Sequence, residues 1–274
     1  MKNTNGLAKG VNRMAYKMVF SDMDGTLLNS QHQITPATVQ SIQRIMQKGI
    51  PFIPVSARPP YAILPYMEQL HNENEIICYS GALILDKNLT ALYSITLENT
   101  LLPQLEQILA QHPTLSVSYY SHLDWFTTDL DSHWIKQESD ITGLVAKEKP
   151  QHLSNVHKIL LIGEATQIEQ IEPLLKQQFP QLSIHRSKKE YLEIMNKAAT
   201  KANAIQFMAQ RAAVDKADII AFGDNFNDLD MLQYVGLGIA MGNSPEEIKR
   251  IAKQITASND EDGIALSLET FFPL

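Results

Sequence analysis

Short apolar runs alternate with amphipathic segments over much of the chain. Over 36–48, apolar residues recur at helical spacing, and Thr35 before a proline predicts the helix start. Other runs are rich in β-branched and aromatic residues, which predicts strands buried on both faces, as at 16–20, 75–79 and 218–222. Strands that alternate with helices predict an α/β fold with a doubly wound parallel-sheet (Rossmann-like) core.

The pattern changes from about residue 83. Strand pairs then alternate with helices, and hairpins are expected over 83–97 and 182–195. This order predicts an inserted α+β domain, built as one open sheet with helices on one face. We therefore expect a core of 14–86 and 193–274, an inserted domain over 87–192, and a flexible N-terminal extension over 1–13.

The composition limits the partners and the compartment of this protein. Its 274 residues include 23 Lys plus Arg and 30 Asp plus Glu, and the net charge of −7 argues against a general nucleic-acid or membrane binder. A small anionic substrate stays compatible, because a site can be locally positive. The one cysteine, Cys78, excludes an internal disulfide and favours a reducing compartment, and no apolar run is long enough to span a membrane. We expect a cytoplasmic protein that is a monomer or a weak homodimer.

Two aspartates directly follow the first predicted strand. Asp22 and Asp24 stand at the end where open parallel sheets bind ligands, and unpaired carboxylates there are costly unless a cation or donors meet them. Gly25 allows a sharp turn, so that both carboxylates can face one point. Such a pair suits divided roles, one carboxylate as a nucleophile beside a divalent cation and the other as a proton carrier. An Asp-Gly turn with local hydrogen bonds is the competing interpretation, although the string through Thr26 and Leu28 is more specific.

Polar residues also follow the next two predicted strands. The second strand contains two prolines, which argue against a regular central strand. It ends in Ser56, whose hydroxyl beside the first N–H groups of a helix is a ready anion site, although an ordinary N-cap is an equally good interpretation. Ala57 and Arg58 complete this tripeptide, and Gly81 follows the third strand after Ser80.

A lysine and two further aspartates complete the candidate set. Lys201 stands near the start of the predicted helix 198–211, where a cation opposes the helix dipole, and this suggests a local need for positive charge. Lys197 lies close by and remains a competitor. Asp224 and Asp228 stand four residues apart where a strand passes into a helix, so both can reach one cation, although acids also suit a helix N-terminus by charge alone.

The order of these four groups resembles the motif order of the haloacid dehalogenase-like superfamily. The match rests on Asp22-Met23-Asp24-Gly25-Thr26, on Ser56-Ala57-Arg58, on Lys201 and on the string 223–228, and it covers most of the chain. The hairpin-rich insert is similar to the type IIB cap of the Cof-like phosphatases in this superfamily. Two positions depart from the usual pattern, because Ala57 stands where relatives have glycine and Ser80 where they often have asparagine.

The resemblance implies a role for each candidate residue. Asp22 would be the nucleophile, Asp24 the general acid and base, and Lys201 the cation that stabilises the transferring group. The substrate-binding residues it implies are Thr26, Ser56, Ala57, Arg58, Gly81 and Asn227. The Mg²⁺ ligands it implies are Asp22, Asp24 through its backbone carbonyl, Asp224 and Asp228.

The function implied is that of a magnesium-dependent phosphatase. It would hydrolyse small phosphorylated metabolites, sugar phosphates or similar monoesters, through an aspartyl-phosphate. A sugar phosphomutase and a non-catalytic regulatory or binding protein on the same scaffold stay open, while the long insert disfavours a receiver-like phospho-acceptor domain.

Substrate choice is expected to reside in the insert, because the motifs contact only the phosphoryl group and the metal. The candidate loops are 120–124 and 186–190, although ordinary exposed turns are the competing interpretation of each. The three basic residues of the second suit a polyanionic or carboxylated substrate.

Overall fold

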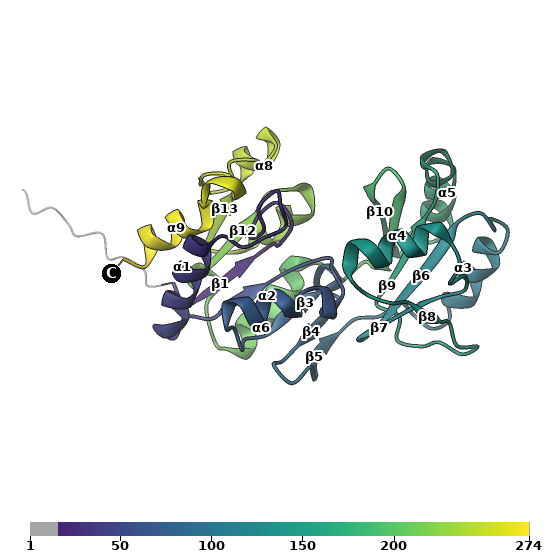
Figure 1. Ribbon diagram of the computed structural model, residues 1–274, viewed down its shortest axis with the longest axis horizontal. Coiled ribbons are helices and arrows are strands. Elements are labelled where there is room, and N and C mark those ends of the chain that lie inside the picture. The colour runs from purple at the N-terminus through teal and green to yellow at the C-terminus, as the bar shows by residue number, and fades with distance from the viewer. Residues whose placement is uncertain (1–15, 274) are drawn as a thin grey trace, which may run out of the picture.

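A computed structural model describes residues 16–273 of the chain. Figure 1 shows two lobes, one built on a five-stranded sheet and one on a six-stranded sheet, with a small three-stranded sheet between them. None of the helices within 16–273 is long and apolar enough to cross a membrane. The predicted N-terminal extension, 1–13, lies outside the described residues.

The first lobe contains the predicted parallel sheet. Its strands are β1 (Met18–Ser21), β2 (Phe52–Pro54), β12 (Ile219–Gly223), β13 (Leu237–Ala240) and β14 (Gln254–Ile255), in the order β14-β13-β12-β1-β2. One face packs against α1 (Pro36–Gln47), α2 (Leu64–Leu70) and α9 (Gly263–Phe271). The other face packs against α6 (Lys201–Arg211), α7 (Leu229–Tyr234) and α8 (Glu246–Ile251). Helices on both faces confirm the doubly wound core.

The third predicted strand is not a regular member of this sheet. β3 (Ile76–Cys78) instead pairs antiparallel with β4 (Leu83–Leu85), which pairs with β5 (Ala91–Ser94). A single parallel bridge, between Val55 and Ile77, joins β3 to the core sheet. The N–H of Ser56 donates to Ile77 on this side at 2.9 Å, whereas Pro54, two residues earlier, has no N–H to give. The missing donor explains why the ladder does not extend along β2.

β5 lies against the core lobe, although the predicted boundary at residue 87 assigned it to the insert. The ring of Tyr93 in β5 lies 4.9 Å from the ring of Phe207 in α6. We therefore propose that the inserted domain begins after β5 rather than at residue 87.

The second lobe is built on the six-stranded sheet, in the order β10-β11-β9-β6-β7-β8. Its strands are β6 (Ser116–Ser121), β7 (Asp124–Thr127), β8 (Lys147–Glu148), β9 (Lys158–Ile162), β10 (Leu182–Lys188) and β11 (Tyr191–Asn196). The predicted hairpin over 182–195 is confirmed as the antiparallel pair of β10 and β11.

Helices lie on both faces of this second sheet. Apolar residues of α3 (Leu102–Leu109) and α5 (Ala165–Gln178) form one cluster with Leu192 and Ile194 of β11. Tyr191 belongs to the opposite face, and its hydroxyl donates to Glu138 of α4 (His133–Thr142) at 2.8 Å. The prediction of helices on one face alone is therefore wrong. Successive side chains of a strand point to opposite faces of the sheet, and α4 packs on the face opposite to α3 and α5.

A histidine lies where the two lobes meet. His157 precedes β9 and is buried, and its ring stacks on Tyr79 with the centroids 5.6 Å apart. Its Nδ1 accepts the backbone N–H of His122 at 3.1 Å, so its Nε2 carries the proton and donates to the hydroxyl of Ser94 at 2.9 Å. Burial, with a further contribution from His122, lowers the pKa of His157 to about 4.

We expect acid to destabilise the protein through His157. The unfolded chain binds this proton near pH 6.5 and the folded chain only near 4, so the free energy of unfolding should fall by roughly 3 kcal/mol as the pH falls through that interval. Above the pKa of the unfolded chain, His157 is neutral in both states and this loss of stability is absent. Urea unfolding of the wild type and of His157→Gln across this pH range isolates it. An identical pH dependence in both proteins would contradict the prediction.

Candidate active site

The carboxyl ends of β1 and β12 bring the predicted aspartates together. The two strands are parallel neighbours, and the N–H of Asp22 donates to the carbonyl of Phe222 at 2.9 Å. Carboxylate oxygens of Asp22, Asp224 and Asp228 lie within 4.8 Å of one another. Asp22 and Asp228 are buried, so their charges must be met inside the protein.

Lys201 supplies a cation to this cluster. Its side chain is 1% exposed, and its Nζ donates to Asp22, to Asp228 at 2.6 Å and to the carbonyl of Val55 at 3.2 Å. Burial lowers the pKa of Lys201, but the two carboxylates outweigh burial and the net pKa is raised. Lys197 is exposed, so of the two competing lysines the structure brings Lys201 to the aspartates.

The start of α6 determines where Lys201 lies. The helix begins at Lys201, three residues later than the predicted 198–211, because the hydroxyl of Thr200 caps it by accepting the N–H of Asn203 at 3.2 Å. Gly81 packs against this cap with φ +103°, and a Cβ on it would lie 2.2 Å from the carbonyl oxygen of Thr200. Gly81 thus permits close packing at the helix start.

Thr26 and Asp228 orient their neighbours in the acidic turn. The Thr26 hydroxyl donates to Oδ1 of Asp224 at 2.8 Å. Oδ2 of Asp228 accepts the N–H groups of Asp224 at 2.9 Å and Asn225 at 3.0 Å, while its Oδ1 accepts from Lys201. Thr26, predicted to bind substrate, therefore holds a carboxylate of the cluster.

The cluster has the charge and the donors to hold a divalent cation. Burial and then Asp228 raise the pKa of Asp22 well above its usual range, and the same two causes raise the pKa of Asp224 to about 6. Three carboxylates face one ammonium group, which leaves an excess of two negative charges when all are ionised. Closely spaced carboxylate oxygens are also the ligand type that Mg²⁺ prefers. The residues present therefore fit a bound divalent metal.

Asp24 lies beside this cluster and is paired with a different residue. Its carboxylate accepts from Nε of Arg58 at 2.8 Å and from Nη2 at 2.6 Å, a bidentate pair. The Asp24 side chain is 48% exposed, so it is accessible to a ligand in a way that Asp22 is not. Arg58 was predicted to contact substrate, and in the structure its guanidinium orients Asp24.

The remaining predicted residues lie between the two lobes. The hydroxyl of Ser56 is buried and accepts the N–H of Arg58 at 3.1 Å. Ala57 and Asn227 line a cavity of about 700 Å³, which Lys201 also lines. Residues of β10 and β11, among them Ser183 and Met195, line the same cavity from the second lobe.

Sequence reasoning missed Asn243 as a residue of the site. Its amide Nδ2 donates to the carbonyl of Gly25 at 2.8 Å, and its Oδ1 accepts the N–H of Asn259 at 3.1 Å. The residue follows the end of β13, so the rule that ligand-binding loops follow strand ends could have identified it.

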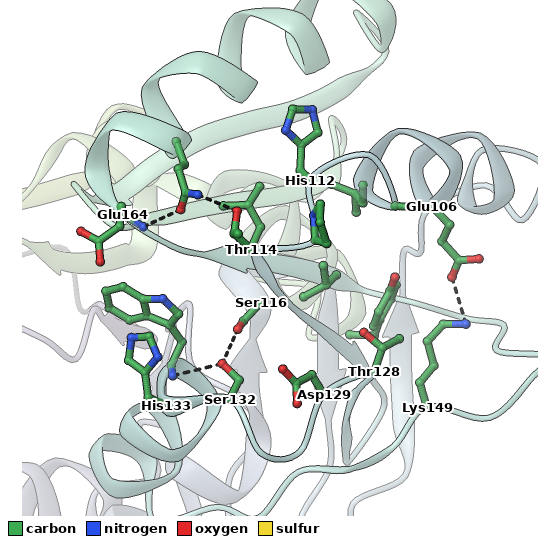
Figure 2. Close-up of a pocket in the computed structure, with 18 residues that line it drawn as sticks. Glu106, His112, Thr114, Ser116, Thr128, Asp129, Ser132, His133, Lys149 and Glu164 are labelled. Carbon is green, nitrogen blue, oxygen red and sulfur yellow. Dashed lines mark hydrogen bonds and ion pairs between the residues drawn. The ribbon is translucent and has the colours of Figure 1, made fainter.

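A larger cavity, of about 850 Å³, lies within the second lobe (Figure 2). It is lined by the end of α3, the start of α4 and the loops between strands, and the pair of Lys149 and Glu106 lies at one side. The predicted site residues all lie within 16–273, and none of them lines this larger cavity. The acidic cluster and its adjoining cavity are therefore the candidate active site.

Comparison with known proteins identifies the family of this chain. Residues 19–268 match the model of a family described as haloacid dehalogenase-like hydrolase. A putative phosphatase of Haemophilus influenzae is 49% identical over 95% of this chain and all of its own length. The chain belongs to the haloacid dehalogenase-like hydrolases. The predicted family and the predicted class of enzyme, a hydrolase, are thereby confirmed.

Solved structures of this family share the arrangement of both lobes. A haloacid dehalogenase-like hydrolase of Bacteroides thetaiotaomicron is 29% identical, with a TM-score of 0.86 over 94% of this chain and all of its own. A protein described as a subclass IIB sugar phosphatase has a TM-score of 0.80 over 93% of this chain and 98% of its own, at 21% identity, which supports the shared fold. The predicted parallel core with an α+β cap matches these folds.

We expect Gly25→Ala to disrupt the acidic cluster and Gly49→Ala to leave it intact. Both glycines have φ +80°, so alanine costs roughly 1–2 kcal/mol of backbone strain at either position. A Cβ on Gly25 would lie 2.5 Å from Oδ2 of Asp224, whereas no described atom lies within 4 Å at Gly49. Titration calorimetry with Mg²⁺ should show at least about tenfold weaker binding for Gly25→Ala alone. Equal affinities in the two variants would refute this account.

Proposed function

We propose that this protein is a magnesium-dependent phosphatase that hydrolyses small phosphorylated metabolites through an aspartyl-phosphate on Asp22. The observation that carries the proposal is the cluster of Asp22, Asp224 and Asp228 around the buried Lys201, beside a cavity large enough for a metabolite. Family membership and the phosphatase names of relatives support it.

The metal would be held by Asp22, Asp224 and the backbone carbonyl of Asp24, with Asp228 behind them. Asp228 already accepts from Lys201 and from two backbone N–H groups, which suits a residue that positions its neighbours. When bound, magnesium supplies positive charge that offsets the charge of the phosphoryl oxygens.

The side chains have complementary roles in the reaction. The Asp22 carboxylate attacks phosphorus, the bond from phosphorus to the ester oxygen breaks, and Asp24 gives its proton to the departing alcohol. Asp24 then takes a proton from the water that attacks the aspartyl-phosphate, which releases phosphate and restores Asp22. Lys201 and the hydroxyl of Ser56 stabilise the negative charge of the transferring group.

The site is proposed to act on a metabolite and not on a macromolecule. The net charge of −7 disfavours nucleic acid, and a cavity of about 700 Å³ suits a small molecule. We also propose a cytoplasmic location, since Cys78 is a free and buried thiol.

We expect phosphate release to require magnesium. Excess chelator should abolish hydrolysis of p-nitrophenyl phosphate and of a panel of sugar phosphates. Mg²⁺ should restore it where Ca²⁺ does not, because Ca²⁺ favours looser and higher coordination. Full activity in excess chelator would refute the proposal. Isomerised sugar phosphate without phosphate release would instead identify a phosphomutase. If neither phosphate nor an isomerised sugar phosphate forms, the protein would be a non-catalytic binding protein.

Asparagine substitutions should separate the two aspartates of the first strand end. Asp22→Asn should abolish transfer from every substrate, because the nucleophile is lost. Asp24→Asn should reduce kcat on alkyl phosphates by about 100-fold or more and reduce it less on aryl phosphates, whose leaving groups need less protonation. Steady-state rates on methyl and p-nitrophenyl phosphate measure this difference. Equal losses on both would exclude Asp24 as the general acid.

A further inference from the structure

The loop that carries Asp24 is held from outside by two other loops. Asn243 follows β13 and Asn259 follows β14, and these parallel strands end at the same edge of the core sheet as β1. The side-chain amide of Asn243 donates to the carbonyl of Gly25 at 2.8 Å, and that of Asn259 donates to the carbonyl of Leu28 at 2.9 Å. The segment from Gly25 to Leu28 is therefore held at both ends by asparagine side chains.

A main-chain N–H sets the orientation of the Asn243 amide. The N–H of Asn259 donates to Oδ1 of Asn243 at 3.1 Å, so the opposite end of this amide, Nδ2, is the end directed at Gly25. An amide turned the other way would place its oxygen against the carbonyl of Gly25 and its NH₂ group against the N–H of Asn259. The two asparagines and the loop thus form one connected chain of hydrogen bonds.

Two of the bonds inside the Asp24 loop are long. The N–H of Thr26 lies 3.3 Å from the carbonyl oxygen of Met23, and the N–H of Leu27 lies 3.3 Å from that of Asp22. Both distances exceed the usual range for such a bond, so these two contacts restrain the loop weakly. The glycine at position 25 has no Cβ and adds conformational freedom. The orientation of the carbonyl groups in this turn therefore depends on donors from outside the loop.

The carbonyl of Asp24 lies directly before Gly25 in the chain. It is the main-chain ligand proposed for magnesium, and only the Cα of Gly25 separates its peptide unit from the one that Asn243 holds. A rotation at Gly25 would turn the two carbonyl groups relative to each other. Residues that orient the ligands of a metal typically change its affinity by about 10–100-fold when they are replaced.

We propose that Asn243 and Asn259 are positioning residues that fix the carbonyl of Asp24 in the orientation that binds magnesium. The proposal rests on the proposed function of this site and adds the residues that prepare its main-chain ligand. Both asparagines act through the main chain of residues 24–28. Asn243 is exposed and Asn259 is half-buried, so water can replace their bonds at little cost in stability. Their contribution is to the geometry of the loop.

The test measures Mg²⁺ binding by titration calorimetry and thermal unfolding without metal, for Asn243→Ala and the wild type. The Kd for Mg²⁺ should rise at least about tenfold, because the Gly25 carbonyl loses its donor. The Mg²⁺ concentration for half-maximal phosphate release from p-nitrophenyl phosphate should rise by a similar factor, while Tm stays close to that of the wild type. Asn259→Ala should change Kd in the same direction, and it carries the test if Asn243→Ala fails to fold.

Asn72→Ala is the matched control. Asn72 makes the same two kinds of bond, since its Nδ2 donates to the carbonyl of Phe52 at 2.8 Å and its Oδ1 accepts the N–H of Asn74 at 2.9 Å. It is buried, and Phe52 is the first residue of β2, at the opposite end of the sheet from the acidic cluster. Loss of this amide should lower Tm and leave the Kd for Mg²⁺ unchanged.

The outcomes separate this inference from the proposed function. Equal Kd values in the wild type and the folded asparagine variants, or an equal rise in Asn72→Ala, would overturn the inference and leave the phosphatase standing. A fall in Tm of Asn243→Ala as large as that of Asn72→Ala would identify a structural role and would also overturn it. A wild type that binds Mg²⁺ but releases phosphate from no substrate would overturn the proposed function alone. A wild type that binds no Mg²⁺ would overturn both.

Discussion

One buried ammonium group makes the rest of this structure possible. Without Lys201, the carboxylates of Asp22 and Asp228 would be buried with no counterion, an arrangement that costs several kcal/mol. The three residues come from the end of β1, the start of α6 and the turn after β12. The contacts between them therefore form only when sheet, helix and turn are assembled together. Assembly of the core therefore also assembles the acidic cluster.

The tripeptide Ser56-Ala57-Arg58 connects this core to everything around it. The N–H of Arg58 binds the Ser56 hydroxyl, while its guanidinium holds Asp24. The carbonyl of Ala57 accepts from Lys158 of the insert. One short loop thus links the Ser56 hydroxyl, which is proposed to bind the phosphoryl group, the proposed proton carrier Asp24 and the second lobe. A shift of the insert acts directly on the geometry of the site.

The sequence predicted what depends on local pattern and strand ends. The meeting of Asp22 with Asp224 could be predicted because parallel strands end at one edge of a sheet. The irregular pairing of β3 with the core sheet could not be predicted. It depends on the fact that Pro54, which has no N–H, stands at a position of β2 that faces β3. The pairing of Arg58 with Asp24 could not be predicted either. Each depends on contacts between segments far apart in the chain, and spacing along the chain carries no information about them.

The contact between Lys158 and Ala57 has a consequence for how such proteins diversify. Its acceptor is a main-chain carbonyl, which every amino acid presents at position 57. This one contact between the lobes therefore places no demand on the side chain at position 57, whereas the stacking of Tyr79 on His157 does depend on a core side chain. At this contact, the core lobe can therefore change its side chain without losing the bond to the second lobe.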